Sequence, residues 1–126
     1  MIVDFDRVFS KTSELKDRTK SFAKRILRLV RSLPPGMESH VIGYQLLRSG
    51  TSVAANYRAV CRARSRADFV SKLGIVIEEA DESALWLELL SETGIVPAVR
   101  LANLQDEANQ LVAILNASKA TAKRNS

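Results

Sequence analysis

Apolar side chains recur every three or four residues along most of the chain, which is the period of an α-helix with one buried face. The first series predicts a helix over about residues 13–33, because Pro34, Pro35 and Gly36 follow it and proline cannot continue a helix. The positions on its buried face are Leu15, Thr19, Phe22, Ile26, Leu29 and Leu33.

A second series predicts a helix over about residues 39–63, with Ile42, Leu46, Val53 and Val60 facing the core. Small residues gather at its middle, and Gly50 is one of them. A glycine costs about 1 kcal/mol of helix propensity relative to alanine. Its presence therefore indicates that a neighbouring helix approaches closely at this point.

Two further series predict helices over about residues 66–93 and 97–118, leaving a basic C-terminal tail at 119–126. Gly94 is suited to end the third helix, and Pro97 is suited to the first turn of the fourth. The buried positions are Phe69, Leu73, Val76, Ala80, Ser83, Leu87 and Leu90 in the third helix and Leu101, Leu104, Ala108, Leu111 and Leu115 in the fourth. Four long helices with short connections predict an all-α fold, an antiparallel up-down four-helix bundle that forms a single domain over residues 1–126.

The third helix carries more apolar residues than one buried face requires. Leu85, Trp86 and Leu89 lie off its core positions, and we expect them to form an interface in a homo-oligomer.

Several classes of function are disfavoured by composition. No stretch approaches the roughly 20 apolar residues of a membrane span, and Asp4 and Asp6 stand where a signal peptide would be basic and then apolar, so we expect a cytoplasmic protein that does not contact membranes. With one cysteine and one histidine, the chain offers neither an intramolecular disulfide nor a cluster of metal ligands, and we expect no metal and no cofactor. Cys61 is expected to be a small buried apolar residue.

Polar residues also recur on one side of the second predicted helix. They are expected to form a buried network with two acidic residues of the third helix, which satisfies their hydrogen bonds and fixes the helix register. Its members are Gln45, Arg48, Ser49, Ser52, Asn56, Glu79 and Glu82. An active site is the less favoured interpretation, because no nucleophile motif, phosphate loop or Glu-x-x-His pair accompanies them. We therefore predict a protein that is not an enzyme.

Charge is distributed unevenly: residues 1–66 hold 14 Lys/Arg and 5 Asp/Glu, whereas residues 67–126 hold 5 and 9. Lys20, Lys24, Arg28 and Arg31 form a basic stripe opposite the apolar face of the first helix, and Arg58 and Arg62 belong to a second basic cluster at the end of the second helix. Such cations suit nucleic-acid phosphates, and the scarcity of aromatic residues among them favours backbone contact with duplex or structured RNA over base stacking. A solvated basic face, or one paired with acidic helices, is the alternative.

Several short motifs resemble the bacterial four-helix bundle family that includes the proteins encoded in intervening sequences of large-subunit ribosomal RNA genes. The motifs are Gln45–Ser49, Ser52–Arg58, Ser65–Phe69, Lys72–Leu73, Glu79–Ala80 and Trp86–Leu87. The resemblance implies a ring-shaped homopentamer with a basic surface proposed to contact nucleic acid, and no established catalytic activity. A more distant relative, the accessory variability protein of diversity-generating retroelements, binds nucleic acid and a reverse transcriptase.

One position departs from the family pattern. Many relatives carry an acidic residue three positions after the motif asparagine, where this chain has Ala59. The surface around Arg58 and Arg62 is therefore more positive than in those relatives, which favours phosphate contact. We expect an oligomeric module that binds RNA or DNA; the alternative is a protein-interaction scaffold that docks a nucleic-acid enzyme such as a reverse transcriptase.

Overall fold

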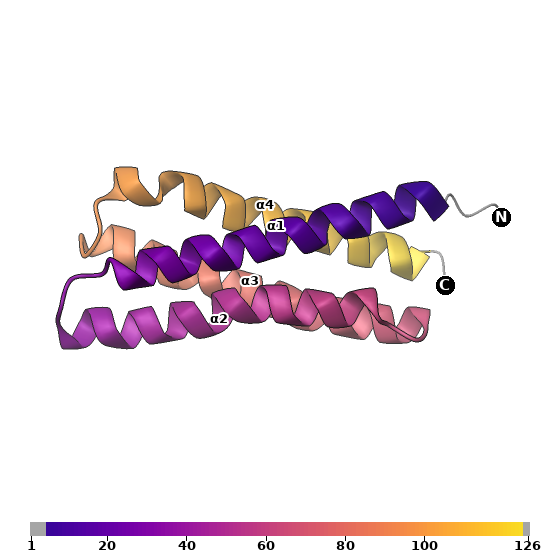
Figure 1. The fold of residues 1–126 in the computed structure, drawn as a ribbon, viewed down its shortest axis with the longest axis horizontal. Helices are drawn as coiled ribbons and strands as arrows, with labels where there is room; N and C mark the ends of the chain where they lie inside the picture. The colour runs from indigo at the N-terminus through magenta and orange to yellow at the C-terminus, as the bar shows by residue number, and fades with distance from the viewer. Residues whose placement is uncertain (1–4, 125–126) are drawn as a thin grey trace.

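A computed structural model describes the backbone of residues 5–124 and the side chains of residues 11–124. It contains four helices in the described residues: α1 (Phe5–Arg31), α2 (Met37–Cys61), α3 (Arg66–Glu92) and α4 (Ala98–Arg124). They form the predicted four-helix bundle, in which successive helices run in opposite directions along one long axis (Figure 1).

The ends of the helices differ from the prediction mainly near the two termini of the chain. Helix α1 begins at Phe5 rather than near residue 13. The prediction of a tail outside the fourth helix was wrong for residues 119–124, because α4 continues to Arg124. This segment has no glycine or proline to stop it, and alanine, the best helix former, stands at 117, 120 and 122. Residues 125–126 of the predicted tail lie outside the described residues.

Most of the predicted apolar series forms the core, whereas Leu29, Leu33, Ile42 and Phe69 are only partly buried and pack against it. Phe22 and Ile26 of α1, Leu46 of α2, Leu87 of α3 and Leu111 of α4 are fully buried. Thr19 and Ser83, the polar members of two series, are also buried. Their hydroxyl groups donate to carbonyl oxygens one turn earlier in their own helices, so that neither is buried without a partner.

Contacts between neighbouring helices are unequal. Helix α2 packs against both α1 and α3, and α3 packs against α4, whereas α1 and α4 touch over a short stretch only. Figure 1 shows these two helices crossing instead of running alongside each other. Where they meet, Arg18 donates to both carboxylate oxygens of Glu107, at 2.6 and 3.2 Å, and this pair raises the pKa of Arg18.

Gly50 explains how closely α1 and α2 approach. A Cβ atom at this position would lie 2.9 Å from both Cγ atoms of Ile26, which is inside van der Waals contact. A Cβ atom at Gly43, two turns earlier on α2, would likewise lie 2.9 Å from Cδ1 of Leu33. These two contacts fix an antiparallel register in which Lys16 and Lys20 of α1 lie across from the last two turns of α2.

Candidate nucleic-acid interface

The basic stripe of α1 lies on the surface, as the sequence suggested. Lys20, Lys24, Arg28 and Arg31 are all exposed. None of them forms an ion pair with another residue in the part of the chain whose side chains are described.

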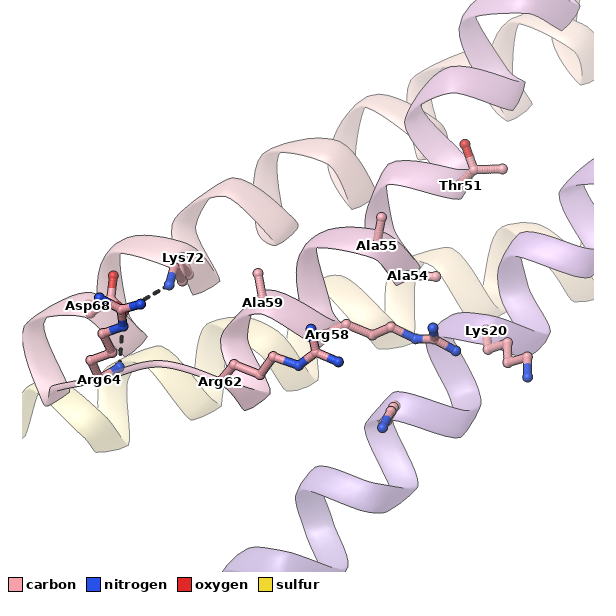
Figure 2. A pocket seen from close by; sticks show the side chains of 11 residues that line it. Lys20, Thr51, Ala54, Ala55, Arg58, Ala59, Arg62, Arg64, Asp68 and Lys72 are labelled. Carbon is pink, nitrogen blue, oxygen red and sulfur yellow. Dashed lines mark hydrogen bonds and ion pairs between the residues drawn. The ribbon is translucent and has the colours of Figure 1, made fainter.

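An open groove of about 870 Å³ lies between α1 and the C-terminal half of α2, and the turn into α3 closes one end of it. Its cations come from three helices and the turn between α2 and α3: Lys16, Lys20, Arg58, Arg62, Arg64 and Lys72. We call this the basic groove. Figure 2 shows Arg58 and Arg62 projecting from α2, with Lys20 across from them on α1.

Small side chains line the α2 side of the basic groove. Thr51, Ala54, Ala55 and Ala59 occupy positions where longer side chains would fill it. Ala59 is one of three uncharged residues between Arg58 and Arg62, so these two cations have no acidic neighbour between them in the sequence. Among residues 11–124, no aromatic residue lines the groove. Its surface therefore offers positive charge and room, but no ring on which a base could stack.

Asp68, the one acidic residue that lines the groove among residues 11–124, is held by its own neighbours. Lys72 donates to the Asp68 carboxylate at 2.8 Å, and the backbone N–H of Arg64 donates to it at 3.1 Å. These hydrogen bonds, that from Lys72 above all, lower the pKa of Asp68. The Ser65 hydroxyl accepts from the Asp68 N–H at 3.0 Å and caps α3. Asp68 thus fixes the turn that carries Arg64 and leaves the groove strongly positive.

The structure brings together only half of the six predicted phosphate-binding residues. Lys20, Arg58 and Arg62 line the basic groove, whereas Lys24, Arg28 and Arg31 lie further along the exposed face of α1 and do not. Lys16, Arg64 and Lys72 were missing from the predicted set. Antiparallel pairing of the first two predicted helices was the signal that could have found Lys16, because it places the start of one helix beside the end of the next.

The predicted polar network is divided into two parts. Arg48 donates to Gln45 at 3.2 Å, to Glu79 at 3.3 Å and, through its other terminal nitrogen, to Glu82. These ionic side chains are partly exposed, with 40% of the Arg48 side chain accessible, so the expectation that they are buried was wrong. A separate and fully buried hydrogen bond of 2.9 Å joins Ser83 to Ser49. This hydrogen bond was not predicted from the sequence, because Ser83 occupies a core position of α3 and was assigned to the buried face.

Ser52 and Asn56 take no side-chain part in this network. The Asn56 amide donates to the Ser52 backbone carbonyl at 2.9 Å, one turn earlier in the same helix. The Asn56 side chain thus satisfies a backbone group of its own helix instead of linking α2 to α3.

The three predicted interface residues differ in exposure. Leu85 is 46% exposed, whereas Trp86 and Leu89 are half-buried. Trp86 packs against the core and donates its indole N–H to Glu82 at 3.4 Å. A single chain does not test the interface, which stays a prediction.

Cys61 does not have the environment that was predicted for it. It is exposed, not buried, so the expectation of a small core residue was wrong. Partial desolvation nevertheless raises the pKa of its thiol and outweighs the opposing effects of Lys16 and Arg62. Over the described residues, no three His, Cys, Asp or Glu side chains are grouped to hold a metal ion. Within the same part of the chain, none of the helices combines the length and the apolar character needed to span a bilayer.

The fold and this surface define an all-helical bundle with an open, strongly basic groove. The chain belongs to the family of 23S rRNA-intervening sequence proteins, whose family model matches residues 11–117. Among solved structures, it is similar to a protein of unknown function from the S23 ribosomal protein family of Bacteroides thetaiotaomicron VPI-5482. The two share 35% sequence identity with a TM-score of 0.81, over 87% of this chain and 98% of that one. No curated protein matches the chain.

Proposed function

We propose that the chain is a cytoplasmic, non-enzymatic module that binds RNA or DNA, with the phosphates contacted in the basic groove and along the α1 stripe. One observation carries this proposal: of the six cations that line the groove, five form no side-chain ion pair with a carboxylate among residues 11–124. Lys72, paired with Asp68, is the exception.

Unpaired cations that converge on one groove suit a polyanion. Phosphate oxygens accept hydrogen bonds from Lys and Arg, and each neutralised phosphate releases condensed counterions. Within the part of the chain whose side chains are described, the groove offers no aromatic ring, and its one carboxylate, Asp68, already accepts from Lys72. Binding should therefore depend little on sequence. Membership in the 23S rRNA-intervening sequence protein family supports RNA as the first ligand to test.

Titration of a labelled RNA hairpin and a DNA duplex at several salt concentrations tests the proposal. If five phosphates are neutralised, the logarithm of the affinity should fall with the logarithm of the salt concentration with a slope of about −4 to −5. Neutralising Arg58 and Arg62 together (R58Q/R62Q) should weaken binding to all sequences and reduce the slope by about two.

A double variant on the α1 stripe, R28Q/R31Q, is the matched control, since it removes the same charge outside the groove. We expect it to weaken binding less than R58Q/R62Q does. Equal losses would show that net charge, and not the groove, sets the affinity. Absence of any binding at low salt by the intact protein would refute the proposal.

We also propose that the module is a homo-oligomer, a pentamer if it follows its family resemblance, with Leu85, Trp86 and Leu89 at the interface. The exposed Leu85 beside a half-buried tryptophan supports this. Light scattering should then give five times the 13.9 kDa chain mass. L85S should lower the subunit number; a monomeric wild-type protein would refute the proposal.

The second candidate function is a scaffold that docks a nucleic-acid enzyme such as a reverse transcriptase. The same exposed apolar side chain, Leu85, supports it. Binding to such an enzyme should persist at high salt and be lost in L85S, which separates it from binding through the basic groove.

A further inference from the structure

A second hollow lies between α1 and α2, at the end of the bundle where the two helices are connected. Its volume is about 350 Å³. No Lys or Arg lines it; its walls include Leu33, Pro34, His40, Tyr44 and Leu47. Tyr44 is 62% exposed, which is unusual for an aromatic residue that has no polar contact to explain it. We call this the tyrosine hollow.

The tyrosine hollow and the basic groove are separate hollows that follow one another along the same pair of helices, and we call the two together the furrow. Both have one wall from α1 and the other from α2. On α2, Leu47 lines the hollow and Thr51 lines the groove, one helical turn or about 6 Å further along. Tyr44 and Arg58 therefore lie on the same side of α2, about 21 Å apart along its axis.

We propose that this furrow binds a nucleic acid in which an unpaired nucleotide adjoins a stem, with the stem's phosphates in the basic groove and the unpaired base stacked on Tyr44. The proposal rests on the proposed function and adds the form of its ligand. Successive phosphates of one strand lie about 3.4 Å apart along the axis of a DNA duplex, so in a DNA ligand the stacked base would lie about six nucleotides from the phosphate at Arg58.

The two halves of the furrow favour this ligand over an apolar protein segment. The basic groove offers cations that suit phosphates and, among residues 11–124, no aromatic ring, whereas the tyrosine hollow offers the ring of Tyr44 and, over the same residues, no Lys or Arg. A nucleic acid strand carries both complements, a charged backbone and flat bases with a stacking face. A base inside a duplex cannot reach the ring, so the stacked base must be unpaired.

Two RNA probes test the inference: a blunt hairpin and the same hairpin with a single-stranded extension that carries 2-aminopurine. Y44A should weaken binding of the extended hairpin by about 5- to 150-fold, the usual loss when one stacking ring is removed. It should leave the blunt hairpin and the salt slope unchanged. Y44F keeps the ring and should bind both probes like the wild type, with 2-aminopurine fluorescence quenched in both proteins and restored in Y44A.

V41A is the matched control, because Val41 is 54% exposed on the same helix but does not line the hollow. We expect it to bind both probes normally. If Y44A affects both hairpins equally or neither, or if quenching persists in Y44A, the inference is overturned while binding in the basic groove stands. A changed subunit number in Y44A would overturn it as well, by assigning Tyr44 to a contact between copies of the chain. If neither probe binds the wild-type protein, the proposed function itself fails.

Discussion

Alanine at Gly50 should leave this protein less stable than alanine at Gly43 does. Both glycines are buried on α2 against α1. Each replacement should gain about 1 kcal/mol of helix propensity. The two sites differ in what the new methyl group would meet.

At Gly50, the methyl carbon would lie 2.9 Å from Cγ1 and Cγ2 of Ile26 and 3.1 Å from its Cβ. Ile26 is fully buried, and its branched side chain is held in one rotamer within a helix, so it cannot move aside. Overpacking of this kind costs about 1–3 kcal/mol. At Gly43, the closest atom is the terminal Cδ1 of Leu33, also at 2.9 Å, but Leu33 is only partly buried and can rotate away.

We therefore expect G43A to raise the free energy of unfolding by up to about 1 kcal/mol and G50A to leave it unchanged or lower it by up to about 2 kcal/mol. The helix propensity gain cancels in the comparison, so the difference of about 1–3 kcal/mol measures the clash with Ile26. Urea unfolding at one fixed protein concentration should separate the two midpoints by on the order of 1 M. If G50A is as stable as G43A, the inferred close packing of α1 on α2 is refuted.

Two further predictions concern buried polar groups. Replacing Ser49 or Ser83 by alanine should each cost about 1 kcal/mol, because the 2.9 Å hydrogen bond between them is fully buried, and the double variant should cost less than the sum of the two. Urea unfolding of all four proteins measures this coupling, and strictly additive losses would show that the hydrogen bond contributes nothing. Burial raises the pKa of Tyr57 from 10.0 to about 12, so the folded state favours the protonated phenol. The contribution of the protonated Tyr57 to stability is complete below pH 10 and is lost as the pH rises toward 12. Across this range the free energy of unfolding should fall less steeply with pH in Y57F than in the wild type. Identical slopes in the two proteins would refute this assignment.

The core could be predicted from the sequence because burial in a helical bundle follows one period. Positions such as Phe22, Leu46 and Leu111 repeat at spacings of three and four, and all are fully buried. The turns were equally accessible to prediction, since Gly94 adopts φ 75° just after α3 and the prolines follow the end of α1. The end of α4 could not be predicted, because the sequence there has no glycine or proline that would distinguish a frayed tail from a continuing helix.

The basic groove was harder to predict because it depends on which residues of different helices face each other. Periodicity places Lys20 and Arg28 on one exposed face of α1, but only the register against α2 brings Lys20 and Arg58 to the same groove. The role of Asp68 was also out of reach: a sequence shows a possible cap, but not that the same carboxylate accepts from both Lys72 and the turn. The exposure of Cys61 was also out of reach, because it depends on where α2 ends: Cys61 is the last residue of the helix.

Because most cations of the basic groove form no ion pair among residues 11–124, the free energy of unfolding should depend on the anions in the buffer. Like charges held together destabilise the folded chain when nothing neutralises them. Any anion that occupies the groove stabilises the fold by mass action, by about 2.7 kcal/mol at a concentration one hundred times its dissociation constant. If phosphate or sulfate occupies the groove, the melting temperature measured in either should exceed that measured in a buffer of weakly binding anions.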